Sequence, residues 1–465
     1  MATVTLINPL IGVKKRYGKF GKAGSVVPPL GLCYIASTLE SQGHKVRIID
    51  GEISCSEQSD IVKHIGEDTD IIGITSSTPG ISSAIEITRL IKEWDKDVPI
   101  VLGGPHVSSL PVETLETGLF NFGVLGEGEL TMSNLVAKIG GGDPYGTDGI
   151  AYLSDGKVKI NRKREPIKDL DTIPFPARHL LPDLRLYRPN AQNYKRLPTT
   201  TMVTSRGCPY GCIFCDKSVF GRSYRTHSPG YVVDEIEMLI NEFKINEIWF
   251  VDDTFTLDNK RAEKICDMIV ERGLDVNWSC LGQVSSVSPD LLKAMAKAGC
   301  WLISYGIESG NQAILDNAKK CITLKQVEQA VRWTRDAGIE SKGFFILGLP
   351  KETIQTMDDT INFAKSLPLD QALFTIATPM PNTEMYSYAV ENNLMFEGVD
   401  WSQHTMLNPI YAPLGLTGEI LQKKNREGWY KFYLRPGYIL SQILNLRSLD
   451  DLKRKLIGLK AILSI

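Results

Sequence analysis

Three cysteines, Cys208, Cys212 and Cys215, lie within eight residues of one another. The spacing C-x3-C-x2-C brings three thiolates onto one compact loop, and Gly207 and Gly211 supply its sharp turns. Three thiolates leave one iron of a four-iron cluster without a protein ligand, so that this iron is open to bind and activate a substrate. The loop therefore predicts a 4Fe-4S cluster that takes part in chemistry rather than one that only carries electrons.

A zinc site or a disulfide scaffold fits the cysteine loop less well. Structural zinc needs a fourth ligand at short range, and the nearest histidine, His227, is twelve residues after Cys215. A disulfide scaffold conflicts with the odd total of nine cysteines and with the expected cytoplasmic location. Chance clustering is the remaining alternative. We expect each of the other six cysteines to be a buried, reduced thiol that acts as a small apolar residue: Cys33, Cys55, Cys266, Cys280, Cys300 and Cys321.

The cysteine motif, with an aromatic residue before its third cysteine, resembles the radical S-adenosylmethionine (SAM) superfamily. The resemblance implies that SAM chelates the open iron through its amino and carboxylate groups. It also implies that reductive cleavage of SAM yields methionine and a 5′-deoxyadenosyl radical, which abstracts a hydrogen atom. Phe214 would then flank the adenine.

The resemblance continues over residues 199–385. Four segments follow the cysteine loop in the order and spacing of the superfamily: FVDDTF at 250–255, YGIESG at 305–310, FILGLP at 345–350 and TPMPNT at 378–383, with Asn382 where relatives have glycine. Gln283 stands where many relatives carry arginine, which leaves its role open. The SAM contacts that the resemblance implies are Phe214, Asp252, Asp253, Thr254, Gln283, Glu308, Ser309 and Gly348.

Alternating strands and helices must position these residues. Apolar strands are expected at 201–204, 247–251, 276–281, 301–305, 343–347 and 372–376, with helical segments such as 232–243, 289–298 and 323–337 between them. Six such units predict a partial (β/α)6 barrel, because a full eightfold barrel needs about 250 residues. The cysteine loop follows the first strand, at the rim where barrel enzymes place their active sites.

The N-terminal part of the chain also alternates strands and helices. Strands are expected at 4–7, 46–50, 71–75, 100–104 and 122–126, and a helix at 30–42. This pattern predicts a doubly wound, Rossmann-like parallel sheet. Each strand ends in small or polar residues, where the ligands of open α/β sheets bind. None of these turns has the G-x-G-x-x-G pattern, which disfavours a nicotinamide dinucleotide.

The two halves together resemble the radical SAM enzymes that carry a cobalamin-binding domain, a subgroup that includes class B methyltransferases and the anaerobic magnesium-protoporphyrin ester cyclase. The resemblance rests on Asn8-Pro9, VPPLGL at 27–32, GGPH at 103–106, GEGE at 126–129 and DLDTIPFP at 169–176. The implied cobalamin contacts are Asn8, Pro9, Leu30, Thr75, Ser76, Gly103, Gly104, His106, Gly126, Glu127 and Gly128. For His106 an ordinary structural role is an equal alternative.

The cobalt-ligating motif D-x-H-x-x-G is missing, since no histidine occurs between Asn8 and Leu30. The subgroup generally lacks it too. Our hypothesis is that cobalt receives no histidine from this loop, which favours five-coordinate methylcobalamin and eases methyl transfer to a carbon radical.

We expect four regions: a cobalamin-binding domain at 1–142, a hairpin and linker at 143–196, the radical SAM barrel at 197–385 and a mainly helical C-terminal region at 386–465. The segment 429–465 mixes apolar residues with lysine and arginine. It is interpreted as helices packed on the barrel, as a lid over the substrate opening, or as a contact with a membrane surface.

The expected activity is SAM cleavage at the cluster followed by methyl transfer from methylcobalamin to an unactivated carbon of a small molecule such as a lipid, pigment or natural-product precursor. A second SAM would restore the methyl group. The main alternative is a radical cyclase without methyl transfer, and a further one is a cobalamin sensor with a vestigial barrel. No catalytic acid or base is predicted, because hydrogen-atom abstraction needs none. The expected electron donor is flavodoxin or ferredoxin.

Composition agrees with an ordinary globular enzyme. The 465 residues are 43% hydrophobic and carry a formal net charge of −2, which gives no electrostatic case for nucleic acid as a partner. The N-terminus lacks the basic and apolar regions of a secretory signal. No stretch approaches the roughly 18 apolar residues of a membrane span. These features predict a cytoplasmic protein.

Overall fold

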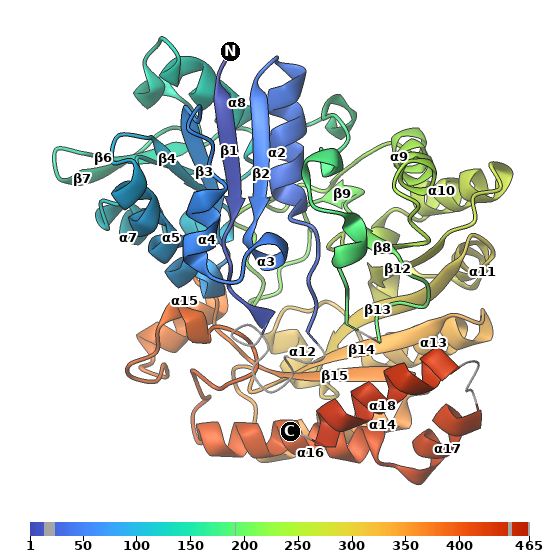
Figure 1. Cartoon of the computed structure of the whole chain (residues 1–465). Coiled ribbons are helices and arrows are strands. Elements are labelled where there is room, and N and C mark those ends of the chain that lie inside the picture. Colours follow the sequence, from blue (N-terminus) through green and yellow to red (C-terminus); the bar gives the residue numbers. More distant parts are fainter. Residues whose placement is uncertain (14–23, 191, 445–448, 464–465) are drawn as a thin grey trace.

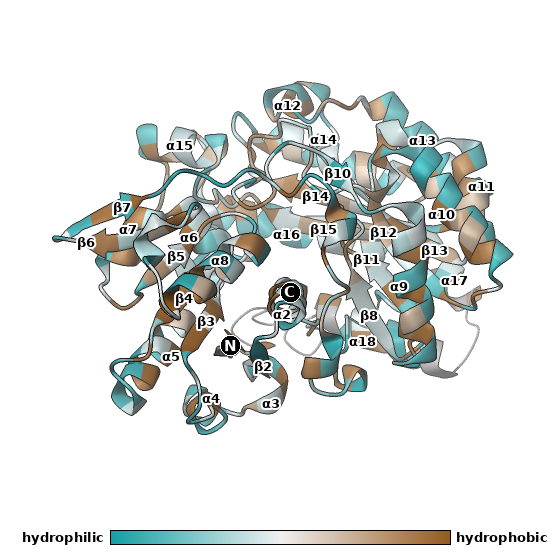
Figure 2. Cartoon of the chain, turned by 90° about the horizontal axis from the view of Figure 1, so that it is seen from above, coloured by the Kyte–Doolittle hydropathy of each residue, from teal (hydrophilic) through white to brown (hydrophobic). Residues whose placement is uncertain are grey.

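The computed structural model describes residues 1–13, 24–190, 192–444 and 449–463. Two sheets lie next to each other, and each is covered by helices (Figure 1). In the view from above, the N-terminal sheet and the second sheet form separate units with helix α2 (Leu30–Ser41) between them (Figure 2). This arrangement confirms the expected order of a doubly wound domain followed by a barrel.

The N-terminal sheet has seven strands in the order β2-β1-β3-β4-β5-β6-β7. The strands from β1 to β5 are parallel, whereas β6 and β7 form a hairpin that adds to the edge of β5 in antiparallel orientation. The hairpin predicted within 143–196 therefore extends this sheet. The strands are β1 Thr3–Asn8, β2 Lys45–Asp50, β3 Ile71–Thr75, β4 Ile100–Gly103, β5 Phe122–Val124, β6 Ile150–Ser154 and β7 Lys157–Ile160.

Helices cover both faces of this sheet, because successive residues of a buried strand point to opposite sides. On β1, Val4 and Leu6 join the core under α2 and α8, whereas Ile7 joins the core under α4 and α5. The helices are α2, α3 Gly51–Ser54, α4 Gln58–Lys63, α5 Ile81–Trp94, α6 Pro105–Ser109, α7 Pro111–Glu116 and α8 Glu129–Ile139. The strand ends are left free to meet a ligand.

The second sheet has six parallel strands in the order β15-β14-β13-β12-β11-β8. Since β8 and β15 lie at opposite edges and do not pair, the barrel is open, as the six β/α units predicted. The strands are β8 Thr199–Met202, β11 Glu247–Phe250, β12 Asn277–Gly282, β13 Cys300–Glu308, β14 Glu340–Leu347 and β15 Gln371–Ile376.

Most of the barrel helices begin at serine or threonine caps, whereas Asp258 caps α10 and Asn311 caps α12. Ser228 and Ser288 each accept a hydrogen bond from the backbone three residues later, and Thr323 and Thr353 form capping boxes. These caps fix where the connections between strand and helix end. The helices are α9 Pro229–Asn241, α10 Asn259–Glu271, α11 Pro289–Lys297, α12 Gln312–Asn317, α13 Leu324–Asp336, α14 Ile354–Ser366 and α15 Glu384–Glu391.

The linker fastens the N-terminal domain to the barrel. The backbone of Ala177 donates to Cys33 O in α2 at 3.0 Å. Next to it, the fully buried Arg178 pairs with Glu235 of α9 and donates to Thr201 O of β8 at 2.9 Å. The linker thus connects α2 directly with the first strand and the first helix of the barrel.

Three further helices end the chain: α16 Gly418–Tyr433, α17 Pro436–Leu444 and α18 Leu449–Leu463. Helix α16 packs on β15, where Gly428 lies against the ring of Phe374 and Trp429 donates to Phe374 O. This contact agrees with the interpretation of helices packed on the barrel. Among the described residues, no helix has the length and apolar character needed to cross a membrane.

Candidate functional site

The cysteine loop leaves β8 through the short strand β9 (Ser205–Arg206), which pairs with β10 (Arg225–Thr226). Gly207 follows with a φ of 84°, and a Cβ there would clash with Ser223 O, so only glycine fits. Cys208 and Cys212 are half-buried and Cys215 is exposed, and none of them forms a disulfide.

The three thiols act on one another electrostatically. The pKa of Cys215 is raised to about 11, mainly by desolvation; Lys217 opposes the rise, and Asp253, Cys212 and Cys208 add to it. Desolvation also raises the pKa of Cys212, partly offset by Lys320 and Lys217. A metal centre must therefore displace the thiol protons when it binds.

Within the described residues no three His, Cys, Asp or Glu side chains are gathered closely enough to hold one metal ion. A 4Fe-4S cluster does not require such a group, because each thiolate binds a different iron. The zinc alternative gains no support, since the ring of His227 stacks on Tyr231 at 4.0 Å and its Nδ1 lies 3.2 Å from Asp171.

Asp252 and Asp253, which follow β11, have different surroundings. The buried Asp252 accepts hydrogen bonds from Thr204 N at 2.6 Å, Thr204 Oγ1 at 2.5 Å and Ser205 Oγ at 2.7 Å. Its oxygens are thus committed to the strand that leads into the cysteine loop. Asp253 instead lines a cavity next to Cys208 and Cys215, and desolvation raises its pKa, with a contribution from Asp252.

The remaining predicted SAM contacts lie at the carboxyl ends of the strands. Thr254 is buried and donates to Asp253 O at 2.6 Å. Gln283 is 7% exposed, and its side-chain Nε2 has no hydrogen-bond partner among the described residues. Glu308, with a φ of 67°, forms a buried ion pair with Lys320 at 2.8 Å.

Ser309 and Gly348 are held by neighbouring turns. Ser309 Oγ lies 3.0 Å from Thr360 Oγ1 of α14, and both side chains are buried. Gly348 has a φ of 94°, and its amide donates to the side chain of Glu352. Phe214 is half-buried against Leu349 and its neighbours. The predicted set therefore surrounds the mouth of the barrel, although Asp252, Glu308 and Ser309 already have protein partners.

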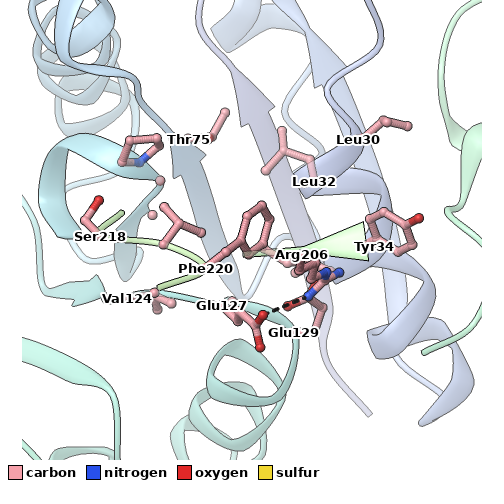
Figure 3. A pocket seen from close by; sticks show the side chains of 18 of the residues that line it. Leu30, Leu32, Tyr34, Thr75, Val124, Glu127, Glu129, Arg206, Ser218 and Phe220 are labelled. Atoms are coloured by element: carbon pink, nitrogen blue, oxygen red, sulfur yellow. Dashed lines mark hydrogen bonds and ion pairs between the residues drawn. The ribbon is translucent and has the colours of Figure 1, made fainter. Parts of the chain in front are cut away.

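A cavity of about 410 Å³ lies between the strand ends of the N-terminal domain and the cysteine loop (Figure 3). The predicted cobalamin contacts that line it are Leu30, Thr75, Gly103, Gly104, Gly126, Glu127 and Gly128. From the barrel side it is lined by Cys208, Cys215 and Asp253. Residues assigned to two different cofactors therefore face the same space.

Four predicted cobalamin contacts lie outside the lining. Asn8 Nδ2 donates to Asp50 at 2.8 Å, and the Ser76 hydroxyl donates to Ser77 O at 2.8 Å. Pro9 also lies away from the cavity. The buried ring of His106 packs edge-on against Trp401 at 5.8 Å, which favours the structural role that was the alternative for this residue.

Two groups of lining residues were not predicted. One is the face of α2 beyond Leu30, and the other is the segment after the third cysteine, which crosses the cavity with Ser218 and Phe220 (Figure 3). The small and polar residues after Cys215 were the only sequence signal for the second group. The unpredicted residues named here are Leu32, Tyr34, Ile35, Lys217, Ser218, Val219 and Phe220.

A buried charge network joins the two domains at the wall of this cavity. Arg206, just before the cysteine loop, pairs with Glu129 at 2.6 Å (Figure 3). Glu127 pairs with Arg225 at 2.7 Å. The guanidinium of Arg206 also lies over the ring of Tyr34, at 5.2 Å. The network fixes the position of the cysteine loop against the N-terminal domain.

Comparisons with known proteins agree with this geometry. Residues 202–364 match the model of the radical SAM superfamily, and residues 19–136 match that of the B12 binding domain. An uncharacterized methyltransferase of Pyrococcus horikoshii is 39% identical over 90% of this chain and 91% of its own length. The chain belongs to the radical SAM enzymes that carry a B12-binding domain.

Other members of this radical SAM family match over most of the chain. The anaerobic magnesium-protoporphyrin IX monomethyl ester cyclase of Rubrivivax gelatinosus is 30% identical over 89% of this chain and 75% of its own. The solved structure of the methyltransferase TsrM from Kitasatospora setae, with cobalamin and a [4Fe-4S] cluster bound, has a TM-score of 0.75 at 17% identity and covers 99% of both chains. The likeness to TsrM supports the fold.

The lining residues fit the cofactors of this radical SAM family. At Gly103 the nearest atom to a Cβ would be Ile74 O at 4.0 Å, so the backbone there is open to a large ligand. At Gly104, with a φ of 100°, a Cβ would lie 2.6 Å from Ser76 O. Behind them the wall is apolar, with Leu6, Val101 and Met132. No described residue that lines the cavity is a histidine. That the loop between Asn8 and Leu30 gives cobalt no histidine stays a prediction.

Proposed function

We propose that the chain is a cobalamin-dependent radical SAM methyltransferase that places a methyl group on an unactivated carbon of a small molecule. The observation that carries this proposal is the single cavity lined by Gly103, Gly126 and Gly128 on one side and by Cys208 and Cys215 on the other. A methyl donor and a radical generator must reach the same carbon atom, and a shared cavity allows this.

When bound, the cluster with SAM would supply radical chemistry and cobalamin a transferable methyl group. The protein's part is to hold and orient them. Cys208, Cys212 and Cys215 would hold the cluster, and Asp252 supports the strand before them through three hydrogen bonds. Phe220, which reaches across the cavity, would help to exclude water from the radical.

Isotope transfer tests the proposal. The protein is reconstituted anaerobically with iron, sulfide and cobalamin, and is given SAM with a deuterated methyl group and candidate lipids, pigments and natural-product precursors. We expect 5′-deoxyadenosine and a product that carries the deuterated methyl group. Product formation with 5′-deoxyadenosine but without the label would contradict methyl transfer.

A radical cyclase is the second candidate, because the anaerobic cyclases of Rubrivivax gelatinosus and Cereibacter sphaeroides are 30% and 31% identical to this chain over 89% and 88% of its length. The same experiment separates the two activities. A cyclase would release 5′-deoxyadenosine and give a product without the methyl label.

An external one-electron donor such as flavodoxin or ferredoxin would reduce the cluster. The cysteines, all free of disulfides in the described structure, support a reducing cytoplasmic location. Photoreduced flavodoxin should replace dithionite in the release of 5′-deoxyadenosine, whereas its failure would argue for another donor.

A contact with a membrane surface is proposed for the C-terminal helices. Exposed apolar side chains gather on α17 and α18, next to the exposed Lys453 and Lys460. The apolar residues are Ile439, Leu440, Leu444, Leu452, Leu456, Ile457 and Leu459. Apolar and basic residues on one surface favour binding to anionic lipid. Co-sedimentation with anionic vesicles should weaken when Leu440 and Leu456 are both replaced by serine, and equal co-sedimentation would contradict the contact.

A further inference from the structure

Several buried nitrogen donors around the mouth of the barrel have no hydrogen-bond partner among the described residues: Nζ of Lys217, Nε2 of Gln283, and Nε and Nη1 of Arg206. Arg206 already pairs with Glu129 through its Nη2, whereas no partner is found for the ammonium of Lys217 or the side-chain amide nitrogen of Gln283. Buried donors in folded proteins almost always find a partner, because an unsatisfied one loses its water without compensation. The cost is larger for a charged ammonium than for an amide. Lys217 in particular therefore points to an anion that the polypeptide itself does not supply.

Lys217 lies on the cluster side of the cavity. It is two residues after Cys215 and lines the cavity together with Cys208, Cys215 and Asp253. Its charge acts on the thiols of Cys212 and Cys215 and on the carboxyl of Asp253. A ligand that reaches this ammonium must therefore lie next to the cluster.

Gln283 approaches the same region from the barrel. It follows β12, and its backbone amide donates to Thr256 Oγ1 at 3.3 Å. Thr256 belongs to the turn after β11 that also carries Asp253 and Thr254. The side-chain amide of Gln283 is uncharged, so among these two donors only Lys217 supplies a positive charge.

We propose that Lys217 is a positioning residue that binds the carboxylate of the methionine part of SAM, with the Gln283 amide as an additional donor. This inference rests on the proposed function, since it assumes that SAM binds at the cluster. A carboxylate offers several lone pairs and accepts from both an ammonium and an amide. The ion pair would orient the carboxylate as SAM approaches the open iron.

SAM titrations of the reduced cluster test the proposal without any turnover. The reconstituted protein is titrated with SAM, and binding is followed by the change in the electron paramagnetic resonance spectrum of the cluster. In Lys217→Met we expect normal iron and cobalamin content and a half-saturating SAM concentration raised at least about 10-fold, the effect of losing one charge-assisted hydrogen bond. Lys217→Arg should recover part of the affinity.

Two further variants complete the test. Lys264→Met removes an exposed lysine of α10 and should leave the titration unchanged. Gln283→Leu leaves the cysteine loop intact and should raise the half-saturating concentration by about 5-fold, the loss of a neutral hydrogen bond. If Lys217→Met assembles no cluster, Lys217→Arg and Gln283→Leu still report on the carboxylate site.

Unchanged SAM binding in Lys217→Met would overturn the proposal. The proposal would also be overturned if Lys217→Met released cobalamin while its SAM titration stayed normal, because the ammonium would then bind an anionic group of the corrinoid. Failure of the methyltransferase proposal gives a different result, since an enzyme without methyl transfer would still show the Lys217 effect on SAM binding.

Discussion

Protonation of the thiols governs how the cluster assembles. Desolvation holds the pKa of Cys215 at about 11, so without metal this thiol stays protonated at neutral pH. Iron binding must displace that proton, so the proton competes with iron and cluster affinity should fall as the pH is lowered. Outside the loop, burial raises the pKa of Cys266 and Cys300 in the barrel core, and Cys280 lies close enough to raise the pKa of both thiols further. The expectation that all six of these cysteines are buried was wrong for Cys55, which is half-buried, and for Cys321, which is exposed.

Replacing any one of Cys208, Cys212 and Cys215 by alanine should abolish the cluster. Three thiolates leave one of the four irons without a protein ligand, and the loss of any one of them would leave a second iron without a ligand. Iron and sulfide analysis after anaerobic reconstitution should show nearly complete loss in each variant. Cys55→Ser, a half-buried cysteine in the N-terminal domain, should keep the parental content. A full cluster in any of the three alanine variants would argue against the assignment.

Asp252 is expected to act through structure. Because it accepts three hydrogen bonds from Thr204 and Ser205, Asp252→Ala should lower the free energy of unfolding by about 3 kcal/mol and reduce cluster content. Asp258→Ala, which removes the cap of α10, should cost only about 1 kcal/mol and leave the cluster intact. Urea unfolding and iron analysis measure both effects. Equal behaviour of the two variants would assign Asp252 no special role.

Strands and helices were predicted well where a single sequence pattern, an apolar run or a capping residue, marks the element. Buried parallel strands such as β3 and β4 are largely runs of apolar residues, and serine or threonine caps begin most of the barrel helices. The start of β14 at Glu340 was missed, because its first residues are polar. The ends of β13 were missed, because its bulge near Gly306 lets the strand continue to Glu308. The place of His106 was also not predictable, since its partner Trp401 lies far along the chain and only the tertiary fold brings the two rings together.

The contact between α6 and the segment near Trp401 should be sensitive to pH. Burial lowers the pKa of His106 to about 4, with a contribution from His404. An unfolded histidine takes up a proton below about pH 6.5, whereas the folded one resists protonation until about pH 4. The folded state therefore loses stability as the pH falls from about 6.5 toward 4.

His106→Phe should reduce this loss, because phenylalanine keeps the edge-on ring contact and cannot titrate. Between pH 7 and pH 5 the free energy of unfolding should fall by about 2 kcal/mol less in the variant than in the parent. Urea unfolding at both pH values measures the difference. The exposed His64 provides the control, since His64→Gln should follow the parent. An identical fall in His106→Phe and the parent would contradict the buried neutral imidazole.

In the whole molecule, the site is formed by the contact between two domains. Motifs at strand ends predicted residues from each domain, and the shared cavity was not deducible because it depends on how α2 and the linker dock on the barrel. Contacts between residues that are distant in the sequence could not be predicted. No sequence pattern indicates that Arg206 and Glu129, 77 positions apart, form an ion pair. The position of Phe220 was not predictable for the same reason, because its neighbours come from both domains.

The Arg206–Glu129 pair should couple the domains. Glu129→Gln or Arg206→Met alone leaves a buried charge without its main partner and should destabilise the fold by about 3 kcal/mol, with loss of bound cobalamin. The double variant should be less harmful than the sum of the two single variants, since neither charge is then left unpaired. Denaturant unfolding and cobalamin retention measure this. Additive effects would indicate that the residues act independently.

Magnetic coupling between the two cofactors tests the central claim, that cobalamin and the cluster share the cavity between the strand ends and the cysteine loop. Electron paramagnetic resonance of the holoenzyme is recorded with cobalt in the Cob(II) form, with the cluster first oxidised and then reduced. A shared cavity of about 410 Å³ predicts that the Cob(II) signal broadens or splits when the cluster becomes paramagnetic. A Cob(II) spectrum that is the same in both states would place the cofactors far apart and contradict the claim.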